Sequence, residues 1–138
     1  MFTPVYGSLY GTFGVAVTDE NVDFDTVGPS SGVTLNTVDD SITVNSSGVY
    51  TVTFSTEVFS TDVNLQVCTV IFRLSINGTP NVFKEIHFQT NLSTFIDFNT
   101  LSRTDQIMLN QGDVIRVSVI FANNTTYINP ALVVTKVA

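Results

Sequence analysis

The sequence contains few of the residue types that usually form catalytic or metal-binding sites. Its 138 residues include one cysteine, one histidine and no tryptophan. A single cysteine excludes an internal disulfide framework. No apolar run approaches the roughly 18 residues that a membrane-spanning helix requires. We therefore expect no membrane insertion, and Met1 to Pro4 lack the basic and apolar segments of a secretory signal. These features predict synthesis in a cytosol.

Charge is also scarce and mostly negative. Charged residues make up 12% of the chain, and the formal net charge is −7. A nucleic-acid-binding surface needs clustered basic residues, whereas the five here are scattered along the chain, at Arg73, Lys84, Arg103, Arg116 and Lys136. We expect no nucleic-acid partner.

Apolar residues, by contrast, are abundant. They form 43% of the chain, and the mean hydropathy is +0.31. The length predicts a single domain over residues 1–138, with residues 1–10 as an N-terminal tail or a first strand. This apolar content exceeds what a soluble protein with so few charges needs. It indicates a subunit interface, a packed array or a large β core.

The distribution of residue types predicts an all-β fold. Val, Thr, Phe and Ile alternate with polar residues in short runs, and clusters of Asn, Gly, Asp, Ser and Pro separate the runs. This pattern is typical of an antiparallel two-sheet sandwich of about ten strands. The expected strands are 11–17, 22–27, 33–35, 41–44, 49–58, 65–76, 82–88, 94–98, 106–109, 114–122 and 131–137.

Alternation also predicts which side chains face the core. Along 66–76 the inward set runs from Cys68 to Ile76 in steps of two, and along 114–122 it runs from Ile115 to Phe121. The strand after Gly48 is expected to bury Tyr50, Val52, Phe54, Thr56 and Val58. The outward sets hold Thr, Val and Ile, which is where we expect another subunit to pack.

Several of these pieces occur together in an order that resembles the C1q/tumour-necrosis-factor-like superfamily. They are Gly48 with Tyr50, the Asn77-Gly78 turn, the series Leu109, Gly112, Asp113, Ile115 and Val117, and an apolar C-terminal strand. The resemblance implies an antiparallel jelly roll. Independently, Gly48 suits close packing, the Tyr50 hydroxyl can bond loop backbone, and Asp113 can accept neighbouring backbone N–H groups.

A narrower similarity covers residues 22–28, 39–50 and 131–138. These segments resemble the C-terminal domain of the collagen-like exosporium glycoproteins of Bacillus, although the chain has no collagen region. The resemblance implies a homotrimeric structural protein of the spore surface, made in the mother cell, whose partners are other spore-surface proteins or a fibre shaft. Phage fibre tips use similar folds, which leaves open a receptor- or glycan-binding tip. That alternative predicts an aromatic, polar loop cluster at 123–129, with Tyr127, and at 90–94.

Few residues could support catalysis or metal binding. His87 shares a strand face with Glu85, but no nucleophile in a suitable turn accompanies them. Cys68 is expected to be a buried small hydrophobe, with an intersubunit link as the alternative. The acidic residues Asp19, Glu20, Asp23 and Asp25 lack the spacing of a calcium loop and fit a solvated loop better; Asp39-Asp40 is expected to form a turn. We therefore expect a protein that is not an enzyme, with no catalytic, cofactor-binding or metal-binding residues and no cofactor.

Overall fold

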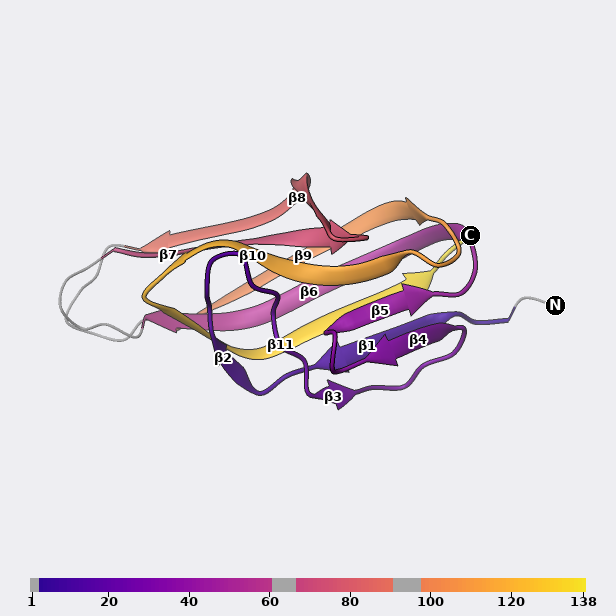
Figure 1. Ribbon diagram of the computed structural model, residues 1–138, viewed down its shortest axis with the longest axis horizontal. Coiled ribbons are helices and arrows are strands. Elements are labelled where there is room, and N and C mark those ends of the chain that lie inside the picture. The colour runs from indigo at the N-terminus through magenta and orange to yellow at the C-terminus, as the bar shows by residue number, and fades with distance from the viewer. Residues whose placement is uncertain (1–2, 61–66, 91–97) are drawn as a thin grey trace.

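A computed structural model describes residues 3–60, 67–90 and 98–138 of the chain. The described residues form strands, turns and connections, with no helix among them, and therefore no helix that could cross a membrane. Eleven strands are present among these described residues (Figure 1). They are β1 (Tyr6–Tyr10), β2 (Phe13–Val15), β3 (Thr26–Val27), β4 (Val33–Asn36), β5 (Ser41–Val44), β6 (Gly48–Ser60), β7 (Cys68–Ile76), β8 (Thr79–Thr90), β9 (Phe98–Leu109), β10 (Val114–Asn123) and β11 (Thr125–Lys136).

The strands form two antiparallel sheets that pack face to face. One sheet has the order β3-β1-β11-β6-β9, with β2 also paired to β11, and the other has the order β4-β5-β10-β7-β8. Strands that follow one another in the chain often lie in different sheets, as β5 and β6 or β10 and β11 do. This is the antiparallel jelly-roll sandwich that the sequence predicts. The N-terminal segment packs as a first strand, because β1 pairs with β11 along its whole length.

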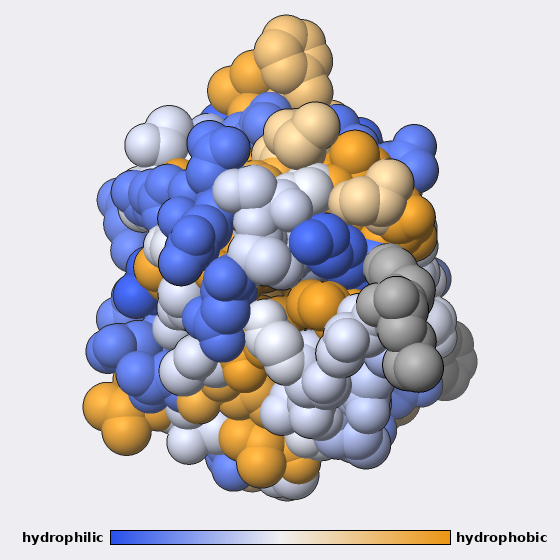
Figure 2. Space-filling view, turned by 90° about the vertical axis from the view of Figure 1, so that its right-hand side faces the viewer, coloured by the Kyte–Doolittle hydropathy of each residue, from blue (hydrophilic) through white to orange (hydrophobic). Residues whose placement is uncertain are grey.

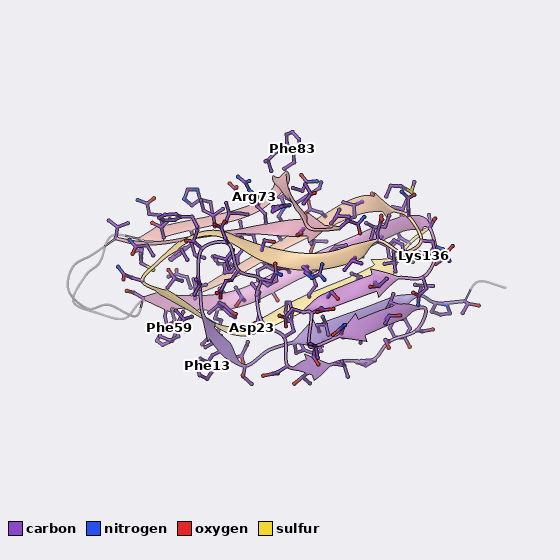
Figure 3. All side chains as sticks on the ribbon, in the orientation of Figure 1. Phe13, Asp23, Phe59, Arg73, Phe83 and Lys136 are labelled. Carbon is purple, nitrogen blue, oxygen red and sulfur yellow. The ribbon has the colours of Figure 1, made fainter. Side chains whose placement is uncertain are left out.

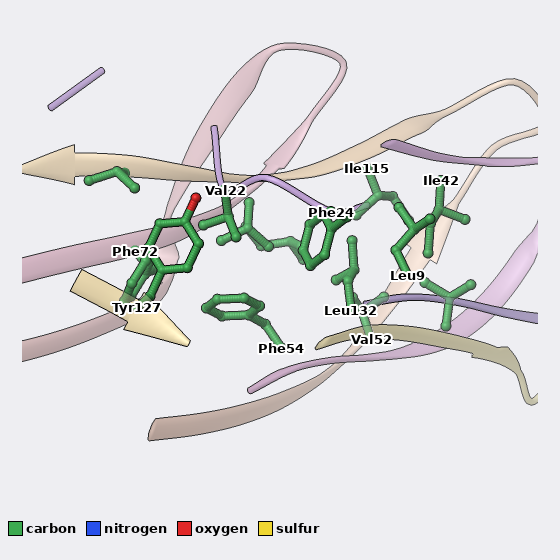
Figure 4. Packing of buried hydrophobic residues seen from close by; sticks show 14 of the residues in the cluster. Leu9, Val22, Phe24, Ile42, Val52, Phe54, Phe72, Ile115, Tyr127 and Leu132 are labelled. Atoms are coloured by element: carbon green, nitrogen blue, oxygen red, sulfur yellow. The ribbon is translucent and has the colours of Figure 1, made fainter. Parts of the chain in front are cut away.

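The core lies between the two sheets and is largely aromatic at its centre. The rings of Phe54 and Phe72 have centroids 5.2 Å apart, and those of Phe72 and Tyr127 are 6.4 Å apart in an edge-on arrangement (Figure 4). Aromatic pairs with this spacing add about 0.5–1.5 kcal/mol beyond the area that they bury. The predicted inward sets of β6 and β7 are confirmed, since Tyr50, Val58 and Cys68 are fully buried.

The residues that carried the resemblance have the structural roles expected of them. A Cβ on Gly48 would meet the backbone oxygen of Ala138, so close packing requires glycine there. The Tyr50 hydroxyl donates to the Ser46 carbonyl at 2.7 Å. Asn77 and Gly78 have φ of 53° and 85°, as a tight two-residue hairpin turn requires. Asp113 accepts the backbone N–H of Asn110 at 2.8 Å, in the turn after β9.

Four expectations about the strands are wrong. The polar stretch between 98 and 106 is not a connection, because β9 is one strand that pairs with β6 throughout. Strand β11 begins at Thr125, six residues earlier than predicted. A bulge between Val119 and Phe121 reverses the alternation in β10, so Phe121 is 46% exposed instead of buried. In segment 22–27 only β3 is strand, yet Val22 and Phe24 are buried in the core.

The hydrogen bond between Tyr127 and the backbone at Asp23 can be tested by mutation. Its hydroxyl accepts the backbone N–H of Asp23 at 2.9 Å, and burial raises its pKa. We expect Tyr127→Phe to lower the free energy of unfolding by about 1–3 kcal/mol, because it leaves that N–H without its partner. Tyr6→Phe, at a tyrosine that is 38% exposed, is the matched control. Equal denaturation midpoints for the two variants would contradict this role.

Candidate assembly surface

The outward face of the six-stranded sheet is almost free of charge. Residues that alternate with the core positions point outward from β6, β9 and β11. Among these outward positions Glu57 is the single charged side chain; most of the others are Thr, Ser, Val, Phe, Ile or Ala. Interface cores are depleted of charge in the same way. The chain has 17 charged residues, of which 5 are basic and 12 acidic. A face with only one of them has the composition of a contact surface.

Apolar side chains concentrate at one end of this face. Phe13 and Val15 of β2 are 69% and 62% exposed, and Phe98 at the start of β9 is 63% exposed. The Phe98 ring lies against Phe59 of β6, with centroids 5.1 Å apart. Strand pairing places β2 beside β11 and β11 beside β6, and Figure 3 shows Phe13 and Phe59 at the same end of the sandwich. These four side chains form a cluster that we call the apolar end of the face.

A second apolar feature projects from the edge of the other sheet. Val82 and Phe83 of β8 are 58% and 79% exposed, and Phe83 stands at the top of the molecule in Figure 3. Figure 2 shows hydrophobic side chains protruding at the top, with hydrophilic residues below. The pairing of β7 with β8 shifts register between Arg73 and Ser75, and this irregularity accompanies the outward bend of β8. The edge strand therefore presents an apolar projection.

A charged network fixes this edge to the first sheet. Arg103 of β9 donates to the backbone carbonyls of Glu85 and Phe83 in β8, at 3.0 and 2.6 Å. It also forms an ion pair with Asp105 at 2.8 Å, and Lys84 lies 3.5 Å from the same carboxylate. Beneath the network is a cavity of about 20 Å³, which is room for about one water. Arg103 thus joins the two edge strands on the open side of the sandwich.

The network determines the ionisation of Asp105. Burial acts to raise its pKa, but the hydrogen bond from Arg103 and the positive charges of Arg103 and Lys84 together hold the pKa below its ordinary value. The same hydrogen bond raises the pKa of Arg103. Both groups therefore remain charged across the physiological range, and the link between β8 and β9 persists.

The histidine and its neighbouring glutamate are not arranged as a catalytic pair. His87 is exposed on the outward face of β8. Glu85 instead pairs with Arg73 at 2.7 Å. The Glu85 carboxylate is thus paired with a cation on β7, because the strand pairing places Arg73 directly opposite Glu85.

Cys68 is buried, as predicted. It is 0% exposed, and its Sγ lies 2.9 Å from the Thr125 hydroxyl oxygen and 3.5 Å from the Asn124 carbonyl. The thiol is enclosed within its own subunit, so an intersubunit disulfide would require local opening of the sandwich.

The acidic segment has structural partners. Asp25 accepts hydrogen bonds from Thr26 and Thr12, which lower its pKa. Asp40 accepts the backbone N–H of Phe24 at 2.7 Å, and burial raises its pKa. The predicted turn at Asp39-Asp40 is present, with φ of 55° at Asp40. Within the described ranges, no three His, Cys, Asp or Glu side chains are grouped so as to hold a metal ion.

The prediction of an aromatic loop at 123–129 is wrong. Tyr127 is 2% exposed and lies in β11, so its ring packs in the core instead of lining a groove. Of the second candidate, 90–94, only Thr90 lies within the described residues, at the end of β8.

Comparisons with known proteins agree on the fold. No protein-family model and no curated protein sequence matches the chain. Among solved structures, the chain is similar to "Structure of Eiger TNF from S. frugiperda", with a TM-score of 0.70 over 99% of this chain and 94% of that one. The sequence identity is 14%, so the similarity concerns the fold alone. The chain has a tumour-necrosis-factor-like jelly-roll fold.

The network at Asp105 predicts a pH-dependent stability. The pKa of Asp105 is lower in the folded chain than in the unfolded chain, where it is near 3.9. The stabilisation is therefore fully present when the pH is above the unfolded-state pKa, and it is lost as the pH falls through the folded-state pKa. We expect Asp105→Asn to lower the unfolding free energy by about 1–3 kcal/mol at pH 7 and to approach the wild type at low pH. Asp19→Asn, at an exposed position, is the control. A difference that does not change between pH 7 and pH 3 would contradict this origin.

Proposed function

We propose that the protein is a non-enzymatic structural subunit of the bacterial spore surface, in the exosporium or an associated appendage, and that it acts as a homotrimer. The observation that carries the proposal is the nearly uncharged outward face of β6, β9 and β11 with its apolar end. Water-exposed apolar groups on this scale mark interaction sites. Covering the face on a neighbouring subunit would bury an area of the usual size, about 800 Å² per partner.

The two apolar features suggest how the subunits meet. The projection at Val82 and Phe83 lies on the β8 edge, and the apolar end at Phe13 and Phe98 lies on the other sheet. A patch that meets a different patch makes a heterologous contact, which closes into a ring when the rotation allows. The edge of one subunit would pack on the sheet face of the next. Three such contacts around one axis give the homotrimer that the family resemblance implies.

The proposed location rests on the sequence resemblance to the collagen-like exosporium glycoproteins. The matched segments have defined places in the structure: 39–50 contains the turn before β5 and the start of β6, and 131–138 contains the end of β11. Both are parts of the jelly-roll framework. Other spore-surface proteins or a fibre shaft would be the partners of the trimer, and synthesis in the mother-cell cytosol would deliver it to the spore without membrane insertion.

Assembly is measured by light scattering on the purified chain. We expect a mass three times the 15.0 kDa of the monomer at micromolar concentration. Phe13→Asp and Phe83→Asp should each shift the mass to that of the monomer, because each places a charge within the proposed contact. Val38→Asp, in the 37–40 turn at 89% exposure, should leave the trimer intact. A wild-type chain that is strictly monomeric would overturn the proposed assembly.

Location is tested on spores of the organism that carries the gene. An antibody raised against the purified protein should label the surface of intact spores in immunogold electron microscopy, and a strain deleted for the gene should lose the label. Label restricted to vegetative cells, or no label on wild-type spores that contain the protein, would refute the spore-surface location while leaving the trimer unaffected.

A further inference from the structure

A polar hollow lies on the outward face of the five-stranded sheet. Its volume is about 240 Å³, slightly below the range of about 300–1,000 Å³ usual for drug-sized ligands. The floor is formed by β10 and β7, and the walls by the loop around residues 19–21 and by the start of β8 after the Gly78 turn. Most of its lining is polar, with side chains from Asp19, Asn21, Ser75, Arg116 and Ser118. The size suits a single sugar ring.

The wall formed by the loop is held in place by β10. The backbone N–H of Asp19 donates to the Val119 carbonyl at 2.8 Å, and that of Val119 donates to the Glu20 carbonyl at 2.7 Å. The Ser118 hydroxyl donates to the Asn21 side-chain oxygen at 3.2 Å. The hollow is therefore a formed site and needs no large rearrangement to receive a ligand.

Ser75 lies at the floor of the hollow. The residue as a whole is 2% exposed, and it lines the hollow. A serine hydroxyl can both donate and accept a hydrogen bond. A ligand hydroxyl or carboxylate in the hollow would bond this group.

Arg116 provides a positive charge at the same place. Its Nε donates to the Asp39 carbonyl at 3.0 Å, which orients the side chain. The cations Arg73, Lys84 and Arg103 each pair with a carboxylate, and among the described residues no such ion pair includes Arg116. Its terminal nitrogens therefore remain available, and a guanidinium binds a carboxylate through two parallel hydrogen bonds.

The remaining lining selects among anions. Asp19 at the rim disfavours a doubly charged phosphate by like-charge repulsion, but its carboxylate can accept hydrogen bonds from hydroxyl groups. Asn21 can donate and accept. Pro80 and Ile120 add apolar surface, against which the C–H face of a sugar ring can lie. The complementary ligand has one carboxylate and several hydroxyl groups.

We infer that the hollow binds a hexuronic acid, either free or as a residue of an acidic polysaccharide. Its carboxylate pairs with Arg116, and its ring hydroxyls bond Ser75, Asn21 and Asp19. The lining of the hollow includes none of Phe13, Val82, Phe83 and Phe98, on which the proposed contact rests, so each subunit of a trimer keeps its own site. Weak single-site binding would then gain strength on a polymeric ligand through multivalency.

The probe is sodium glucuronate, titrated into the ¹⁵N-labelled full chain and followed by amide NMR shifts. We expect saturable shifts at millimolar concentration, centred on Asn21, Ser75, Arg116 and Ser118. Arg116→Gln should weaken binding by about tenfold or more, equivalent to about 1.4 kcal/mol. Ser75→Ala, which is nearly isosteric, should weaken it by a smaller factor, and its spectrum reports whether the fold is retained. Lys136→Gln, at a cation outside the hollow, should bind as the wild type does.

Matched ligands separate the chemistry from nonspecific effects. Glucose lacks the carboxylate and acetate lacks the hydroxyl groups, so each should bind at least about tenfold more weakly than glucuronate if both sets of contacts form. Three results would each overturn the inference: no saturable shift with glucuronate, equal shifts with acetate, or unchanged affinity in both the Arg116→Gln and Ser75→Ala variants. None of these results depends on the oligomeric state.

Discussion

The rest of the structure depends on one constraint, which is the burial of every second side chain between two β-sheets. Tyr50, Val52 and Phe54 of β6 face Ile115 and Val117 of β10 across the core, and all five are nearly inaccessible. Because successive residues of a strand point to opposite faces, a register that buries this set also fixes which residues point outward. The two outer surfaces of the sandwich are thus set by the same alternation that builds its core.

The two outward faces differ in chemistry, and this difference gives them different roles. The six-stranded sheet presents Thr, Ser and apolar side chains with a single charge, Glu57, in β6, β9 and β11. The outward positions of the five-stranded sheet include Arg73, Glu85 and Arg116. A face without charge loses little on desolvation, whereas a face with charges remains in water or takes a charged ligand. Assembly through the uncharged face and the β8 edge is therefore compatible with ligand binding on the charged face of the same subunit.

The open side of the sandwich is the place most exposed to unwanted pairing with another chain. Strands β8 and β9 are the edges of their sheets there, and unpaired edges are templates for unwanted pairing. Arg103 satisfies two carbonyls of β8 while paired to Asp105, so the edges are held to each other. The same bend of β8 that accommodates this link carries Phe83 into solvent, where it is available to a neighbouring subunit.

Much of the framework could be predicted from the sequence, because its signals are local. The strand 41–44, the Asn77-Gly78 turn, the packing role of Gly48 and the inward sets of β6 and β7 depend on alternation and turn chemistry within a few residues. Strand β9 and the early start of β11 could not be predicted. Thr100 to Gln106 have the composition of a loop and become strand only by pairing with β6. The Asn129-Pro130 pair also has the composition of a loop, and it lies at the register shift between Ile128 and Ala131, on both sides of which β11 pairs with β6. The inward prediction for Phe121 failed because a bulge between paired strands is not visible in one strand alone. The sequence by itself determined which side chains share a face within each stretch of strand that has no bulge. Only the tertiary structure decided which faces carry the assembly surface and which segments, such as Asn21, Ser75 and Arg116, meet in a site, because sheet pairing joins residues that are far apart in the chain.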